Sequence, residues 1–255
     1  MLDTTLLALA SLFAGCIDAI GGGGGLVLVP ALFASYPGAA PATLFGTNKG
    51  AAVWGTAWAM LQYARRVSLP WNALLPATAA ALVGSFAGAW SVTLVDATGL
   101  RRILPFVLLA VLVYTLLRKD MGRTHAPRYH GRTQAMLASL IGAVIGFYDG
   151  FFGPGTGSFF MFLFVRLLGF DFLHASASAK LLNTGTNLAA LLLFGLTGHV
   201  WWPLAAVMAV ANVAGSLLGT HLALRRGAGF VRGVFVCVVG ALILKTVWDG
   251  YLGTR

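Results

Sequence analysis

Long apolar runs alternate with short polar connections along most of the chain, and this pattern is typical of helices that cross a membrane. A bilayer core about 30 Å thick is spanned by about 20 residues of α-helix. Six runs have about that length, at roughly 43–64, 72–95, 101–117, 174–197, 202–223 and 229–248. The pattern therefore predicts an all-α integral membrane protein.

Two further apolar runs, at about 4–36 and 134–168, are too long for one straight helix across a membrane. As continuous helix each would measure about 48–50 Å, at 1.5 Å per residue. Glycines interrupt both: five in a row at 21–25, and Gly-Pro-Gly-Thr-Gly at 153–157. Because such sequences cannot cheaply continue a helix, we expect each run to form two half-helices joined by unwound backbone.

The two halves of the chain repeat each other. An offset of 131 residues maps Asp18 onto Asp149 and Lys49 onto Lys180. It also relates Gly15 to Gly146, Gly22 to Gly153, Gly24 to Gly155, Trp71 to Trp202, Gly84 to Gly215, Ser85 to Ser216, Gly88 to Gly219 and Arg101 to Arg232. Charged residues that recur without a gap inside apolar runs indicate an internal duplication.

We therefore expect a first transmembrane repeat over 1–117, a basic cytoplasmic linker over 118–133 and a second transmembrane repeat over 134–255. About eight membrane segments would form two sets of four, and the first segment of each set would be broken or re-entrant at its glycine-rich loop. Paired broken segments in duplicated halves are typical of secondary transporters.

The halves can point the same way or opposite ways. If the broken segments cross the membrane completely, the halves are parallel; if they enter and return as hairpins, the halves are inverted. With the linker taken as cytoplasmic, the hairpin arrangement raises the number of basic residues on the cytoplasmic side from nine to eleven. The positive-inside rule therefore favours the inverted arrangement.

Composition excludes the soluble alternative. Hydrophobic residues make up 58% of the chain, charged residues only 9%, and none of the seven acidic residues is Glu. Soluble domains carry about 25% charged residues. The net charge of +10 does not indicate nucleic-acid binding, because the basic residues lie mostly between the apolar runs, as in cytoplasmic loops. We expect the lipid bilayer, and no nucleic acid, as a partner.

The two cysteines carry no predicted chemistry. Cys16 and Cys237 lie far apart in apolar sequence, without a metal-ligand spacing such as C-x-x-C. They are expected to be small buried hydrophobic residues rather than a disulfide. The sequence predicts no metal site, no cofactor and no catalytic residue.

Lys49 and Lys180 are the lysines inside apolar runs that recur between the halves. An ionisable residue in such a place costs about 2.5–3.5 kcal/mol on insertion scales, and it usually faces a cavity or a partner. Alternatively, each lysine extends to the nearby membrane surface. Their recurrence in both halves favours a functional role.

Asp18 and Asp149 have two interpretations. A buried carboxylate can carry a proton, because burial and a nearby lysine act on its proton affinity in opposite directions. It can equally cap the unwound backbone and neutralise Lys49 or Lys180 as a structural ion pair. The sequence does not separate the two.

The glycine breaks predict an anion site. Backbone N–H groups are free at the start of a half-helix, where the helix dipole is positive. Two such ends meeting at a pseudo-twofold axis, with the lysines beside them, fit a small oxyanion; alternatively, the glycines only allow close helix packing. The expected substrate-binding residues are Gly22, Gly23, Gly24, Thr47, Asn48, Lys49, Gly153, Gly155, Thr156, Ser178, Lys180, Asn183 and Asn187, with Thr184 and Thr186 as further possible donors.

Four stretches carry a likeness to a known family. They are the glycine-rich stretch at 15–25 with Pro30, the Gly-Thr-Asn-Lys element at 46–49, the stretch at 146–158, and Lys-Leu-Leu-Asn at 180–183 with Thr186 and Asn187. Together they resemble the sulfite exporter TauE/SafE family of membrane permeases, over nearly the whole chain. One departure is Ala179, which stands where the first half has Asn48, so the site is expected to be asymmetric.

The resemblance implies a multi-pass permease of the bacterial inner membrane that moves a small sulfur-containing or organic anion. We expect alternating access, with protons as a possible coupling ion. The alternatives are an anion channel and a membrane enzyme acting on an anionic lipid headgroup. Such an enzyme would need a nucleophile or a general base with an orienting partner, and only the two repeated aspartates are candidates. The oligomeric state is not predicted.

Overall fold

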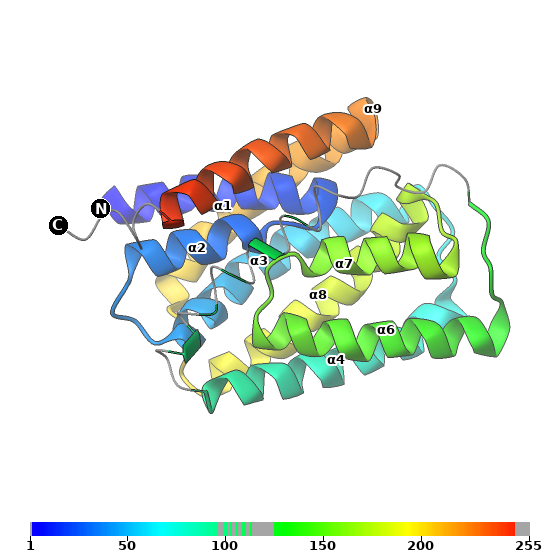
Figure 1. Ribbon diagram of the computed structural model, residues 1–255, viewed down its shortest axis with the longest axis horizontal. Coiled ribbons are helices and arrows are strands. Elements are labelled where there is room, and N and C mark those ends of the chain that lie inside the picture. The colour runs from blue at the N-terminus through cyan, green and yellow to red at the C-terminus, as the bar shows by residue number, and fades with distance from the viewer. Residues whose placement is uncertain are drawn as a thin grey trace.

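The computed structural model describes residues 2–95 and 125–247, with isolated positions between 99 and 113; of 226–247 only the backbone is described. The predicted segment at 101–117 therefore lies mostly outside the described residues. The described chain is helical and contains no strand. Its long helices lie roughly side by side along one direction (Figure 1), which confirms the predicted all-α class.

Each half begins with a helix of spanning length followed by a short one. In the first half these are α1 (Leu2–Gly21) and α2 (Gly25–Ser35). In the second they are α6 (Gly131–Phe151) and α7 (Thr156–Leu163), which continues as the π-helix η1 (Phe164–Leu168). Both pairs reverse direction at the glycines and form hairpins (Figure 1).

Each glycine break therefore lies at the end of a helix of spanning length and not in the middle of one. This corrects the expectation of two half-helices. The apolar residues before each break already fill a spanning helix of 20 or 21 residues. Gly22 and Gly153, which correspond at the 131-residue offset, have backbone φ angles of +77° and +90°. Side-chain-bearing residues rarely adopt this region, so glycine allows the chain to turn at both positions.

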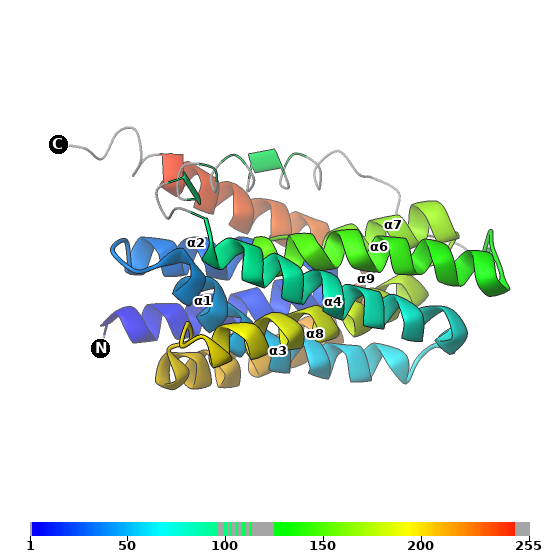
Figure 2. The same ribbon diagram turned by 90° about the horizontal axis from the view of Figure 1, so that it is seen from below.

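The remaining helices are α3 (Pro41–Ala64), α4 (Trp71–Thr93), α8 (Phe172–Leu196) and α9 (Trp202–Val247). The sequence predicts a break at 224–228, but α9 is helical through it. The direction of the chain still changes within this helix, because its red end returns toward the side on which it began (Figures 1 and 2).

Five of the described helices are long and apolar enough to cross a membrane: α1, α4, α6, α8 and the part of α9 over Trp202–Arg225. α3 is equally long but less apolar, because it contains Thr47, Asn48 and Lys49. These three side chains are buried within the protein. The protein interior, rather than lipid, therefore surrounds the polar part of α3.

Corresponding helices of the two halves run in opposite directions. α1 and α3 run from left to right in Figure 1, whereas α6 and α8 run from right to left. The contacts agree, because α1 packs against α9 in the way that α6 packs against α4. This is the inverted arrangement that the basic residues favour.

Pairs of hydrogen bonds repeat with the halves exchanged. The Ser85 hydroxyl donates to the carbonyl of Thr186 at 2.7 Å, and the Ser216 hydroxyl donates to the carbonyl of Gly55 at 2.6 Å. Ser216 lies 131 residues after Ser85, and Gly55 lies 131 residues before Thr186. The second bond is therefore the first bond with the two halves exchanged. Such an exchange is the signature of a pseudo-twofold axis between the repeats.

Candidate functional site

The two glycine breaks meet at the centre of the molecule. The backbone of Gly22 lies against that of Gly157 so closely that neither has room for a side chain. The Ser158 N–H donates to the carbonyl of Gly22 at 3.2 Å, and the Ser158 hydroxyl donates to the carbonyl of Gly21. The first turn of α7 is thus bound to the end of α1.

One ion pair at this junction is fully enclosed. Lys49 Nζ on α3 lies 2.7 Å from Asp149 Oδ2 on α6, and the side chains are only 3% and 2% exposed. Lys49 Nζ donates to Asn187 Oδ1 on α8 at 3.0 Å.

A second ion pair is more open. Lys180 Nζ on α8 donates to Asp18 Oδ2 on α1 at 2.7 Å, and it also donates to the Asp18 carbonyl. The Asp18 side chain is 13% exposed. Thr56 on α3 adds a hydroxyl donor to Asp18 Oδ2 at 3.2 Å.

Both ion pairs join opposite halves. Each repeat supplies one lysine and one aspartate, and each lysine is paired with the aspartate of the other repeat. Pairing of this kind satisfies four charges that would each be costly alone in a low-dielectric interior. The residues around the pairs differ, because Thr56 occupies the position that corresponds to Asn187.

A cavity lies between the two pairs, with a free volume of about 380 Å³ counting the part open to solvent. The part that can hold the centre of a water molecule measures only about 20 Å³, which is room for about one water molecule. It is lined by Ala14, Asp18, Gly22, Gly24, Gly25, Leu28, Asn48, Lys49, Ala52, Thr56, Asp149, Gly153, Thr156, Gly157, Asn183, Asn187 and Asn212.

Two helix N-termini reach this cavity. α2 begins at Gly25 and α7 at Thr156, and both residues line it. Some of their N–H groups are already used, since those of Leu26 and Thr156 donate to carbonyls within their own turns. The positive ends of both helix dipoles nevertheless face the same space.

Asn48 is the polar side chain there without a hydrogen bond. It is 4% exposed, and its Oδ1 has no partner among the described residues. Buried polar atoms are normally hydrogen-bonded. The Asn48 side chain is therefore available to bind a ligand at the cavity wall.

The structure gathers most of the predicted site residues around the cavity, and five do not line it: Gly23, Thr47, Gly155, Ser178 and Lys180. The Thr47 hydroxyl accepts from the Trp201 N–H at 3.1 Å. Lys180 does not line the cavity itself, but it is paired with Asp18, which does. Ser178 is fully buried.

Sequence reasoning overlooked Thr56 and Asn212, which also line the cavity. The repeat contains a signal for Thr56, because the 131-residue offset maps it onto Asn187. Asn212 has no such signal, since Ala81 is its counterpart. Its Nδ2 donates to the Ser11 carbonyl at 3.1 Å, which holds α9 against α1.

Comparison with known proteins gives a consistent result. The family model described as sulfite exporter TauE/SafE matches residues 7–246. The chain is 38% identical to the probable membrane transporter protein YfcA of Escherichia coli strain K12, over 96% of this chain and 90% of that protein.

Two further relatives agree with this match. The probable membrane transporter protein ORF9 of a Sinorhizobium species is 38% identical, over 95% of this chain and 92% of that protein. A probable membrane transporter protein of Haemophilus influenzae is 34% identical, over 92% and 91%. No solved structure is detectably similar to this chain.

These relatives are named as transporters, which agrees with a role other than catalysis. The match covers both repeats, both glycine breaks and both ion pairs. Together with the spanning helices, it makes this chain a multi-pass membrane protein like its bacterial relatives. The chain belongs to the sulfite exporter TauE/SafE family of membrane transporters.

Proposed function

We propose that this protein is a secondary transporter that moves a small anion, a sulfur oxyanion or an organosulfonate, across the cytoplasmic membrane by alternating access. The observation that carries the proposal is the pair of crossed ion pairs, Lys49 with Asp149 and Lys180 with Asp18, beside a cavity between inverted repeats. Substrate sites of inverted-repeat transporters lie at the interface between the repeats.

Several groups at the cavity support a negatively charged substrate. Two helix N-termini and the Lys49 ammonium favour negative charge. Asn48, Asn183 and Asn187 add amide groups that can donate hydrogen bonds to oxygen atoms. The family description, a sulfite exporter, supports a sulfur oxyanion or a sulfonate within this class.

The lysines are neutralised in this conformation, so an anion must take the place of a carboxylate. Protonation of Asp18 would release Lys180 to pair with the anion, and loss of that proton on the other side would restore the ion pair. One proton would then travel with each anion that displaces one carboxylate. Asp18 suits this role better than Asp149 because its side chain is the more exposed of the two.

The test is flux of labelled sulfite, and of a labelled sulfonate, into vesicles that contain the purified protein. Lys180→Met and the double variant Lys49→Met/Asp149→Asn should each lower flux about tenfold or more, since a hydrogen bond to a charged group contributes about 1.5–3 kcal/mol. Arg66→Met removes an exposed loop cation instead and should transport normally. Unchanged flux in both site variants would overturn the site.

Coupling and substrate need separate measurements. An imposed pH gradient should change the flux if protons are coupled, and flux that ignores the gradient removes proton coupling only. A thermal-shift screen of sulfite, sulfate, sulfonates, sulfoacetate and carboxylates ranks the anions, because a tight ligand stabilises the folded protein by mass action. An anion flux per molecule far faster than carriers sustain would indicate a channel instead.

A further inference from the structure

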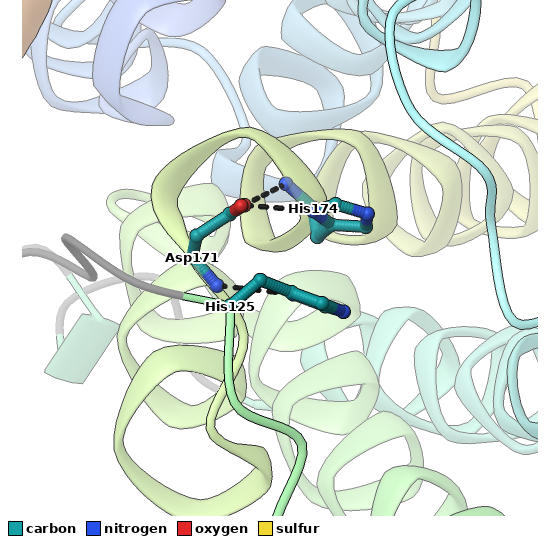
Figure 3. Close-up of side chains that lie close together, drawn as sticks. All are labelled: His125, Asp171 and His174. Carbon is teal, nitrogen blue, oxygen red and sulfur yellow. Dashed lines mark hydrogen bonds and ion pairs between the residues drawn. The ribbon is translucent and has the colours of Figure 1, made fainter.

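A cluster of metal-ligating side chains lies outside the transport site. His125 lies within the linker that joins the repeats, and Asp171 and His174 lie at the start of α8. Figure 3 shows the three side chains together. Their nitrogen and oxygen ligand atoms all lie within 4.8 Å of one another.

We propose that His125, Asp171 and His174 form a binding site for a divalent transition-metal ion of the Zn²⁺ type. Two imidazoles and one carboxylate are ligands that Zn²⁺ accepts, and a three-ligand site leaves a position for water. Imidazole nitrogens favour such metals over Mg²⁺ or Ca²⁺, which prefer oxygen ligands. The proposal is independent of the transported substrate.

The backbone holds His125 in place. The N–H of Ala126 donates to the carbonyl of Gly169 at 3.0 Å, and the N–H of Arg128 donates to the carbonyl of Leu168 at 2.9 Å. The linker end is thereby paired with the turn that precedes α8. The Asp171 N–H also approaches Nδ1 of His125 at 3.4 Å, so two segments far apart in sequence meet in a defined register.

Asp171 organises the other side of the cluster. It is the N-cap of α8, and its Oδ1 accepts the His174 backbone N–H at 2.8 Å. The same oxygen lies 2.8 Å from Nδ1 of His174. With the ring proton on Nε2, Nδ1 keeps its lone pair, so this nitrogen and the carboxylate are both available as ligands.

The two imidazoles are stacked, with ring centroids 3.7 Å apart and planes inclined by 22°. Their outer ring nitrogens point away from Asp171, so the inner nitrogens, Nδ1 of each ring, are the ones near that residue (Figure 3). Ligand atoms of a tetrahedral zinc site with bonds of 2.0–2.1 Å lie about 3.3 Å apart. A modest side-chain rotation would bring the ligand atoms, which lie within 4.8 Å of one another, to this spacing.

A metal bound here would tie the linker between the repeats to α8. The same helix carries Lys180, six residues after His174, or about 9 Å along the axis. The sequence does not reveal the complete site, because His125 lies 46 residues before Asp171.

The experiment is calorimetric titration of ZnCl₂ into the full-length protein, prepared without a histidine tag in detergent, with Co²⁺ absorption as a report on the ligands. His125→Ala and His174→Ala should each weaken Zn²⁺ binding at least about tenfold. Asp171→Asn should do likewise while preserving the helix cap, since Asn caps as well as Asp. His130→Ala, an exposed histidine near the linker end, is the matched control.

Three results would overturn the proposal. The first is no Zn²⁺ binding by the wild-type protein. The second is equal binding by wild type, Asp171→Asn and His174→Ala. The third is a loss in His130→Ala as large as that in His125→Ala. Unchanged thermal unfolding of Asp171→Asn without metal shows that weaker binding reflects a lost ligand and not a lost fold.

Discussion

The two repeats are nearly identical where they pack and different where they meet at the site. Gly88 lies against the Phe147 carbonyl, and Gly219 lies against the Cys16 carbonyl, its counterpart with the halves exchanged. At the site, by contrast, the Asp149 side chain is 2% exposed and that of Asp18 is 13% exposed.

The helix contacts at glycines such as Gly88 and Gly219, here called the frame, are symmetric, whereas the site is not. Small residues fix how closely the backbones approach, and they recur because both halves need the same frame. The site departs from symmetry in its residues as well as in its exposure, since Thr56 faces Asp18 whereas Asn187 faces Lys49. An inverted-repeat carrier in any one conformation must be asymmetric in this way, because its site opens to one side at a time.

The largest effect is expected from removing a lysine. Lys49→Met leaves Asp149 buried without its counter-charge and should lower the free energy of unfolding by about 3–5 kcal/mol. Lys180→Met should cost less, because Asp18 reaches solvent and keeps the Thr56 hydroxyl. Unfolding by SDS titration in mixed micelles measures both.

The matched control for this prediction is Lys49→Met/Asp149→Asn, which removes both charges and should recover much of the loss. Equal costs for Lys49→Met and Lys180→Met would show that the two ion pairs are equivalent. That outcome would contradict the distinction between an enclosed and an open pair.

A smaller and symmetric effect is expected in the frame. Gly88→Ala and Gly219→Ala each place a methyl group against a backbone carbonyl of the other half. Each should lower the free energy of unfolding by about 1–3 kcal/mol, as overpacking does. The two values should agree closely, which the same SDS titration tests.

Gly38→Ala is the control for these glycines, because nothing lies within 4 Å of an added methyl group there. It should leave stability unchanged. If Gly88→Ala and Gly219→Ala differed several-fold, the frame would not be symmetric in energy.

The next effect is the loss of one interhelical hydrogen bond. Ser85→Ala and Ser216→Ala each remove a buried hydroxyl that donates to a carbonyl on another helix. Each should cost about 1 kcal/mol, again to the same extent in both halves. Ser91→Ala is the control, since its hydroxyl donates to Ala87 within its own helix; a control loss as large as the other two would refute the interhelical origin.

The smallest effect on stability is expected from Asn48→Ala, which gives the first half the residue that the second half has at Ala179. Removing an unpaired buried polar group relieves about 1–3 kcal/mol of desolvation, which offsets the lost packing. Thermal unfolding should therefore change little, whereas the anion-induced thermal shift should shrink. A large loss of stability would mean that Asn48 is structural.

Much of the fold could be predicted from apolar runs. The predicted segments at 72–95 and 174–197 differ by one or two residues at each end from α4 (Trp71–Thr93) and α8 (Phe172–Leu196). Lipid imposes this length on a spanning helix, so composition suffices. The predicted segments at 202–223 and 229–248 fall within one assigned helix, α9, although the chain reverses direction within it (Figure 1).

The site could be predicted in part. Recurrence at one offset identified Asp18, Asp149, Lys49 and Lys180, because charges inside apolar runs are costly and therefore rare. It did not show which lysine meets which aspartate. Pairing depends on how the two repeats are turned relative to each other, and a one-dimensional repeat holds no such information.

The sequence by itself determined that the chain is a membrane protein built from two repeats, each with a glycine break and two intramembrane charges. Only the tertiary structure decided that the repeats are inverted, that the ion pairs cross between them, and that the Asp149 side chain is more deeply buried than that of Asp18. The tertiary structure alone also shows that His125 lies beside Asp171 and His174. Local composition fixes what each segment can be, whereas contacts between distant segments arise when the helices pack in space.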